Sequence, residues 1–293
     1  MENILITGAN GQLGSEIFNS VKNNNSDLKK FNFIFTDIAE LDLTNIEKLN
    51  KYFSLNKIDY IVNCAAYTAV DKSESDIYNA EKINIYSVKS LAEISKKQNI
   101  KLIHISTDYV FDGKSCNPYK EDSKTNPQGV YGKTKLKGEN EIISCQVTSI
   151  ILRTSWLYSF YGQNFVKTIQ KLAKEKSSLN IIYDQIGTPT YARDLAEIIL
   201  LIITEKQNVF GPNEIKIYNY SNEGVASWYD FAKAIVEFSE LKCEINPIET
   251  KDYPTPAKRP HYSVLDKGKI KKELNIKIPY WRDSLKECVR REK

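Results

Sequence analysis

The chain has 293 residues, of which 41% are apolar and 27% are charged, a composition typical of folded globular proteins rather than disordered or collagen-like chains. Its 41 Lys and Arg against 37 Asp and Glu give a net charge of +4, too small an excess to indicate nucleic-acid binding. The longest apolar run, Ile198–Ile203, is far shorter than the roughly 20 residues of a membrane span, and Met1–Ile4 predicts no secretory signal.

Cysteine and histidine usage narrows the chemistry further. The five cysteines, at positions 64, 116, 145, 243 and 288, are scattered and form no C-x-x-C pair. This pattern favours a reducing cytoplasm and indicates neither a disulfide framework nor a zinc site, so no metal is expected. The two histidines are His104 and His261. Because His104 falls inside an apolar strand, we interpret it as a core residue and expect acid–base chemistry on another side chain.

Apolar strands alternate with helices through the first half of the chain. Strands are expected over 3–7, 31–36, 59–63, 101–106 and 148–153, and helices over 12–22, 46–55, 76–98 and 130–143. Thr44-Asn45-Ile46-Glu47 reads as a capping box that opens the second helix. Strands that are apolar throughout and separated by helices indicate an α/β fold, a doubly wound parallel sheet of the Rossmann type with both faces covered.

The pattern is looser after residue 153, with helices expected over 164–175 and 193–204, a strand over 179–183 and a loop over 246–260. We expect a dinucleotide-binding domain over 1–153, with about 188–222 packing back on its sheet. A smaller C-terminal substrate-binding domain would comprise about 154–187 and 223–293.

A glycine-rich turn follows the first predicted strand and precedes the first predicted helix. Gly8, Gly11 and Gly14 are spaced G-x-x-G-x-x-G. Such a turn needs residues without a Cβ for its tight bend, for close approach to a diphosphate and for helix–strand packing. The N–H groups at the helix start would then bind the diphosphate, so the turn predicts a dinucleotide site.

An acid ends the second predicted strand. Asp37 lies 23 residues after Gly14, where a carboxylate accepts hydrogen bonds from an adenosine ribose, although it could instead cap a turn. It should repel a 2′-phosphate, and residues 8–14 contain no Lys or Arg to offset this. The residues therefore favour NADH modestly over NADPH.

Tyr131 and Lys135 form a Y-x-x-x-K pair on one face of a predicted helix. An ammonium near a phenol lowers the pKa of the phenol, so that tyrosine can exchange a proton near neutral pH. The spacing alone is common, but Thr107 follows the fourth predicted strand, at the sheet edge where ligands bind in such folds. Its hydroxyl would hydrogen-bond a substrate carbonyl oxygen beside Tyr131.

Five segments together resemble the dTDP-4-dehydrorhamnose reductase family of the extended short-chain dehydrogenase/reductase superfamily. They are S-T-D-Y-V-F-D-G at 106–113, Y-G-K-T-K at 131–135, R-T-S-W-L-Y at 153–158, D-Q-I-G-T-P-T at 184–190 and R-P-H-Y-S at 259–263. The resemblance treats 1–290 as one family unit. It implies reduction of the C4 keto group of a dTDP-linked 4-keto-6-deoxy sugar by NADH or NADPH, the last step of dTDP-rhamnose synthesis for surface polysaccharide.

The resemblance also implies roles for particular residues. The catalytic residues would be Thr107, Tyr131 and Lys135. Cofactor contacts would come from Gly8, Gly11, Gln12, Leu13, Gly14, Asp37, Asp42, Leu43, Ala65, Ala66, Tyr67, Tyr131 and Lys135. The sugar nucleotide would meet Thr107, Asp108, Trp156, Asn164 and Arg259, although Trp156 could instead be a core aromatic and Arg259 a surface ion-pair residue.

Some members of the family form dimers around a magnesium ion held by glutamates. Glu16 matches one such position, but Arg193 lies near where another acid would be expected, and its charge disfavours a metal. The expected assembly is a monomer or a homodimer, with no nucleic acid or membrane as partner.

Two other functions are compatible with these motifs. An epimerase or dehydratase of a nucleotide sugar would recycle bound NAD, but a dehydratase would need Asp-Glu after the threonine, where Asp108-Tyr109 stands. The second of these functions is that of a non-catalytic binding subunit with the same fold, which the intact Thr107, Tyr131 and Lys135 disfavour.

Overall fold

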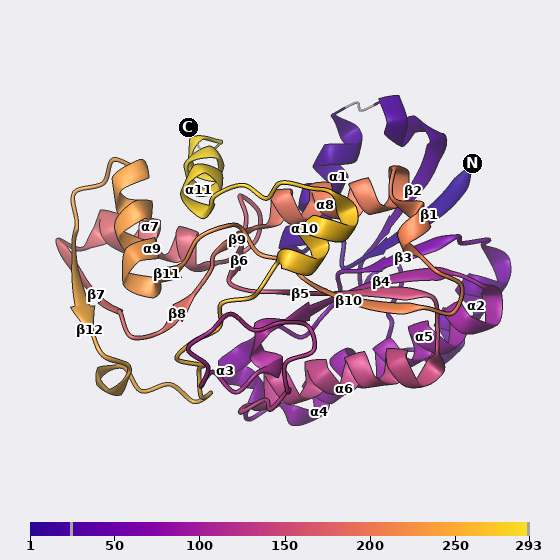
Figure 1. Ribbon diagram of the computed structural model, residues 1–293, viewed down its shortest axis with the longest axis horizontal. Coiled ribbons are helices and arrows are strands. Elements are labelled where there is room, and N and C mark those ends of the chain that lie inside the picture. The colour runs from indigo at the N-terminus through magenta and orange to yellow at the C-terminus, as the bar shows by residue number, and fades with distance from the viewer. Residues whose placement is uncertain (24–25, 292–293) are drawn as a thin grey trace.

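The computed structural model describes residues 1–23 and 26–291. Its centre is a six-stranded parallel sheet in the order β10-β5-β4-β3-β1-β2 (Figure 1). The strands are β1 (Glu2–Thr7), β2 (Phe31–Thr36), β3 (Tyr60–Asn63), β4 (Lys101–Thr107), β5 (Ser149–Thr154) and β10 (Ile215–Asn219). The predicted α/β fold with a parallel sheet is confirmed.

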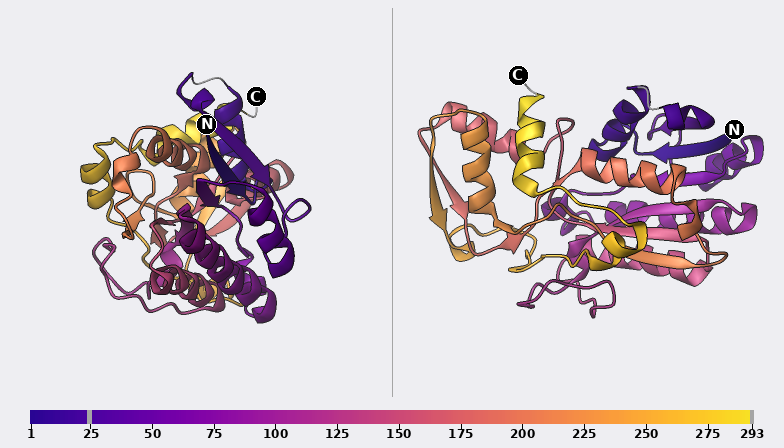
Figure 2. Two further views of the ribbon diagram at one scale, coloured as in Figure 1. Left: turned by 90° about the vertical axis from the view of Figure 1, so that its right-hand side faces the viewer. Right: turned by 45° about the horizontal axis from the view of Figure 1, so that its top comes forward.

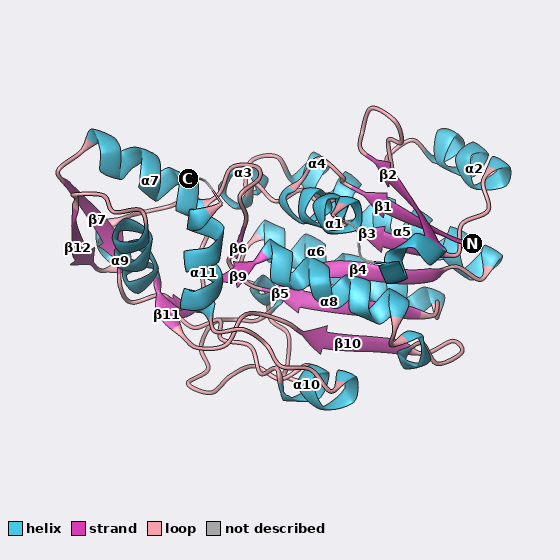
Figure 3. Ribbon diagram, turned by 90° about the horizontal axis from the view of Figure 1, so that it is seen from above, coloured by secondary structure: helices cyan, strands magenta, loops and turns pink. Residues whose placement is uncertain are grey.

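Helices cover both faces of this sheet, as the view from above also shows (Figure 3). On one face lie α1 (Gln12–Lys22), α8 (Ala192–Thr204) and α10 (Gly268–Leu274). On the other lie α2 (Ile46–Leu55), α5 (Ser87–Gln98) and α6 (Val130–Cys145). The helix predicted over 76–98 consists of α4 (Ile77–Glu81), a π-helical stretch (Lys82–Tyr86) and α5, and α3 (Val70–Ser73) precedes it.

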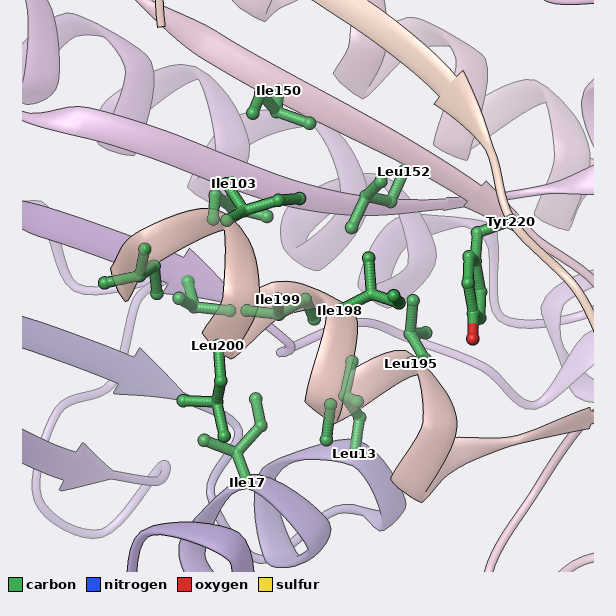
Figure 4. Close-up of a cluster of buried hydrophobic side chains, with 14 of the residues drawn as sticks. Leu13, Ile17, Ile103, Ile150, Leu152, Leu195, Ile198, Ile199, Leu200 and Tyr220 are labelled. Carbon is green, nitrogen blue, oxygen red and sulfur yellow. The ribbon is translucent and has the colours of Figure 1, made fainter. Parts of the chain in front are cut away.

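Helix α8 carries most of the packing on its face of the sheet. Its side chains Leu195, Ile199 and Leu200 lie between α1 and the strands, against Ile103 of β4 and Leu152 of β5 (Figure 4). Burial of these aliphatic side chains holds α8 on the sheet, where the sequence predicted a helix over 193–204 to pack.

Most of the remaining elements form a separate hydrophobic cluster beyond the carboxyl ends of the sheet strands, at the end of the molecule opposite the N-terminus (Figures 1 and 2). This cluster includes residues of α7 (Phe165–Glu175), α9 (Trp228–Phe238) and α11 (Trp281–Arg290). The short strands are β6 (Leu157–Tyr158), β7 (Ser178–Ile182), β8 (Ile186–Gly187), β9 (Thr190–Tyr191), β11 (Ala226–Ser227) and β12 (Glu244–Ile248). They pair as β6–β9, β7–β12 and β8–β11.

Two local predictions were wrong. The segment 246–260 is not all loop, since β12 pairs in parallel with β7. Pro247 is tolerated because a strand of a two-stranded sheet has one open edge, where no N–H is needed. The cap of α2 is Asn45, whose side chain accepts a hydrogen bond from Lys48 N at 3.0 Å, while the Thr44 hydroxyl donates to Asp42 at 2.7 Å.

No helix in the described ranges 1–23 and 26–291 is both long and apolar enough to cross a membrane.

Candidate active site

A cavity of about 820 Å³ lies at the carboxyl ends of the sheet strands, bordered by the glycine turn, α6 and residues 154–157 and 162–164. Nearly all the residues that the sequence assigned to the site line it. These are Gly8, Gly11, Gln12, Leu13, Gly14, Asp37, Asp42, Leu43, Ala65, Ala66, Thr107, Asp108, Tyr131, Lys135, Trp156 and Asn164. The cavity thus joins the predicted cofactor and catalytic residues in one space.

The glycine turn fits a dinucleotide diphosphate. Gly8 has a φ of +63°, and a Cβ there would lie 2.7 Å from the backbone nitrogen of Ala65. A Cβ on Gly14 would collide with the Gly8 carbonyl, whereas one on Gly11 would meet only that carbonyl, at 3.2 Å, and otherwise extend into open space. Helix α1 begins without a side-chain cap and without an acidic residue in its first turn. Its leading N–H groups therefore suit an anionic ligand.

Asp37 belongs to both the cavity wall and the glycine turn. Its carboxylate accepts hydrogen bonds from Asn10 N at 2.9 Å and Ile38 N at 2.8 Å. The Asp37 N–H in turn donates to the Glu40 carboxylate at 2.9 Å. Two carboxylates, those of Asp37 and Glu40, therefore lie at this end of β2. Asp37 also caps the turn, which was the alternative role considered for it from the sequence.

Thr107, Asp108 and Tyr131 lie together on the cavity wall. The Thr107 hydroxyl donates to the Asp108 carboxylate at 2.9 Å and accepts from Tyr109 N at 3.2 Å. Burial raises the pKa of Tyr131 to about 12, while a hydrogen bond with Thr107 acts in the lowering direction. The prediction of a lowered pKa for Tyr131 was therefore wrong in its net direction, because loss of solvent outweighs the hydrogen bond with Thr107 and the Asp108 carboxylate adds to the rise.

Lys135 is buried one helical turn beyond Tyr131 on α6. Its Nζ donates to the carbonyl oxygen of Ile105 at 2.6 Å and lies 3.3 Å from His104 Nε2. Burial lowers the pKa of Lys135 to about 8, and the carboxylate of Glu139 opposes this shift. The interpretation of His104 as a core residue agrees with its complete burial.

The part of the cavity near Asp108 combines an acid with aromatic rings. Burial raises the pKa of Asp108 to about 6. Trp156, at a φ of +46°, stacks on Trp228 with ring centroids 3.6 Å apart, and both line the cavity. Trp228, the first residue of α9 and 72 positions after Trp156, was not predicted as a site residue, because no local pattern links the two rings.

Three predicted ligand contacts have structural partners of their own. Asn164 lines the cavity but caps α7 through Lys167 N and donates to Gln12 at 3.0 Å. Tyr67 and Arg259 are not among the described residues that line the cavity. The Tyr67 hydroxyl donates to Asp76 at 3.0 Å. Arg259 makes a bidentate ion pair with Asp71, at 2.9 and 2.7 Å, which is the alternative role that its sequence context left open.

The two positions weighed for magnesium are both occupied by ion pairs. Glu16 is buried and receives Arg291 at 2.9 Å and the Ser159 hydroxyl at 2.7 Å. Arg193 pairs with Glu197 and Glu287. Within residues 1–23 and 26–291, no group of three or more His, Cys, Asp or Glu could hold a metal ion. The Glu16 carboxylate is thus neutralised by the guanidinium of Arg291, so these residues do not fit a magnesium site.

The parallel sheet, the glycine turn and the Tyr131/Lys135 pair define a dinucleotide-binding protein of the short-chain dehydrogenase/reductase type. A family profile described as the RmlD substrate binding domain matches residues 1–293, and the chain belongs to this family.

Named relatives cover nearly the full chain. A dTDP-4-dehydrorhamnose reductase of Aggregatibacter actinomycetemcomitans is 41% identical, over 98% of each chain. A solved dTDP-4-dehydrorhamnose reductase of Clostridium acetobutylicum has a TM-score of 0.91 and 40% identity, covering 99% of both chains. That of Bacillus anthracis, solved in complex with NADP, also has a TM-score of 0.91, with 34% identity and 99% coverage of both.

Proposed function

We propose that this protein reduces the C4 keto group of dTDP-4-dehydro-L-rhamnose to give dTDP-L-rhamnose, using NADH or NADPH. The observation that carries the proposal is the meeting of Thr107, Tyr131 and Lys135 with the glycine turn in one cavity. A dinucleotide site alone would suit many enzymes, whereas a half-buried phenol beside a hydroxyl suits proton donation to a carbonyl oxygen.

The proposed roles follow from the geometry and protonation of each group. When bound, a reduced nicotinamide supplies the hydride that the carbonyl carbon accepts. Tyr131, whose raised pKa keeps it protonated at neutral pH, gives its proton to the carbonyl oxygen. Thr107 polarises the same oxygen from the end of β4. The ammonium of Lys135 places a positive charge at the cavity wall, where it can donate a hydrogen bond to a ribose hydroxyl.

The two parts of the fold would divide the binding. Residues 1–153 and about 188–222 would hold the dinucleotide through the glycine turn and Asp37. Residues of about 154–187 and 223–293 would add the sugar-nucleotide side, where the stacked rings of Trp156 and Trp228 offer an apolar surface beside Asp108. Arg259 would bind the diphosphate only if its ion pair with Asp71 were broken.

We place the enzyme in the cytoplasm, as a monomer or homodimer, and its product would supply surface polysaccharide. The finer choice of sugar is also part of the proposal, since another nucleotide-sugar 4-ketoreductase could use the same proton donor.

Product analysis tests this assignment. The protein is incubated with dTDP-4-dehydro-L-rhamnose and NADH or NADPH, nucleotide oxidation is followed at 340 nm, and the sugar product is identified by NMR. A reductase consumes one reduced nucleotide per dTDP-L-rhamnose formed. A product at C4 of the opposite configuration would assign a different ketoreductase. An epimerase converts sugar without net oxidation, and a binding subunit converts nothing.

A further inference from the structure

A row of polar side chains crosses the otherwise apolar sheet to reach Lys135. Thr7, Asn63 and His104 are direct register partners on the neighbouring strands β1, β3 and β4. Leu5, Ile61 and Leu102 lie two positions earlier on these strands and belong to the core beneath α5 and α6. Because side chains two positions apart share a face of the sheet, the polar row lies on that same face. The row therefore points toward α6, which carries Lys135.

Short contacts link the members of this row into a chain. Thr7 Oγ1 lies 2.8 Å from Asn63 Oδ1, Asn63 Nδ2 lies 3.1 Å from His104 Nδ1, and His104 Nε2 lies 3.3 Å from Lys135 Nζ. None of the four side chains is more than 2% exposed. Four buried polar groups in line are costly unless each is hydrogen-bonded, so the row calls for a role that apolar residues could not fill.

We propose that His104 is a positioning residue that accepts a hydrogen bond from Lys135 and, backed by Asn63 and Thr7, fixes the charged ammonium at the cavity wall. The proposal rests on the proposed function, because it assigns the ammonium the supporting role beside Tyr131. Two donors of the ammonium are then used by His104 Nε2 and the Ile105 carbonyl. The third is left for a ligand in the cavity that Lys135 lines.

Proton accounting sets the histidine tautomer. An ammonium only donates, so Nε2 must accept and the neutral ring must carry its proton on Nδ1. In the structure the Asn63 amide turns Nδ2 toward His104 and Oδ1 toward Thr7. The Nδ1–H tautomer requires the opposite amide orientation, in which Oδ1 accepts from Nδ1–H and Nδ2 donates to the Thr7 hydroxyl; the heavy-atom positions are the same for both orientations. Burial and the charge of Lys135 lower the pKa of His104 well below its usual range, which keeps the ring neutral as this arrangement requires.

The other titratable groups around Lys135 leave this role to His104. Cys64, after β3, stays a thiol because burial raises its pKa to about 12. Tyr131 on α6 is protonated at neutral pH. The Glu139 carboxylate, one turn further along α6, favours the ammonium by its charge but is itself held by Arg153 and Ser106. Among these residues, His104 is the neutral side chain that offers an acceptor atom, Nε2, to Lys135 Nζ.

A variant series separates positioning from plain stability. His104→Leu removes the acceptor, so the Lys135 ammonium should be lost at lower pH. We expect the alkaline limb of the kcat profile to move down by roughly one unit from the Lys135 pKa of about 8, so that kcat at pH 8 falls about fivefold. The amide of His104→Gln reaches the place of Nε2 and should restore the limb, whereas that of His104→Asn reaches only that of Nδ1 and should not. Leu102→Ala, on the same strand and face, is the matched control: it should lower the melting temperature and leave the limb in place.

A second measurement does not depend on turnover. In protein labelled with ¹⁵N-histidine, long-range proton–nitrogen NMR reports the tautomer of each ring, and His261→Gln assigns the two signals. The Nδ1–H tautomer of His104 at pH 7 supports the proposal, and the Nε2–H tautomer overturns it. An unshifted alkaline limb in His104→Leu also overturns it. If the wild type turns over no sugar while the Nδ1–H tautomer is found, the proposed function fails and the His104–Lys135 contact stands.

Discussion

Replacing Arg153 by Met should destabilise the protein more than any surface substitution. The guanidinium of Arg153 meets Glu139 through two hydrogen bonds, of 3.0 and 2.7 Å, and the two side chains are only 4% and 1% exposed. Arg153→Met would leave the Glu139 carboxylate buried with the Ser106 hydroxyl as its remaining partner. Removing one partner of such a pair costs about 3–5 kcal/mol, because the other charge stays buried without compensation.

The loss is measurable as a melting temperature and as a free energy of unfolding in urea, followed by tryptophan fluorescence. For a chain of 293 residues the expected decrease in melting temperature is roughly 5–8 °C. The informative partner is the double variant Arg153→Met/Glu139→Leu, which replaces both charges by apolar groups. Its stability should lie between those of Arg153→Met and the wild type, since the stranded charge is gone.

Two results would refute this reasoning. Arg153→Met could melt within about 2 °C of the wild type, which would mean that water or another cation compensates Glu139. Alternatively, the double variant could be less stable than Arg153→Met, which would mean that Glu139 without Arg153 still stabilises the protein through Ser106 and Lys135 rather than acting as an isolated charge.

Three further predictions concern the cavity. Tyr131→Phe should lower kcat by roughly 10²–10⁴ while leaving NADH affinity, measured by fluorescence titration, near the wild-type value; unchanged kcat with chemistry rate-limiting would remove Tyr131 as proton donor. Asp37→Ala should weaken NADH binding about tenfold or more and NADPH binding less, so the ratio of kcat/KM for the two nucleotides should change; a constant ratio would show that Asp37 serves only the glycine turn, through Asn10. Asp108 has a folded-state pKa raised to about 6, so its contribution to stability is full below the unfolded value near 4 and is lost as pH rises through 6. Asp108→Asn should therefore melt above the wild type at pH 8, with the advantage shrinking toward pH 4; a pH-independent difference would contradict the raised pKa.

The sequence by itself determined the first half of the fold and most of the site. Strands β1 to β5 are short apolar runs because both faces of a parallel sheet are buried, so each was readable without knowledge of its partners. The glycine turn and the Tyr131/Lys135 pair were equally readable, because each depends on a fixed spacing along one turn or one helical face. Of the residues predicted for the site, all but Tyr67 and Arg259 line the cavity, and several of these predictions came from the family resemblance rather than from a local pattern.

Tertiary structure alone decided the features that depend on distant segments. Strand β10 and the β7–β12 pair form through partners far apart in the chain, and β12 carries a proline that argues against a strand locally. The ion pairs of Arg259 with Asp71 and of Arg291 with Glu16 join residues 188 and 275 positions apart. Burial also reversed the expected pKa direction of Tyr131, because desolvation depends on everything packed around a group and not on its neighbours in sequence.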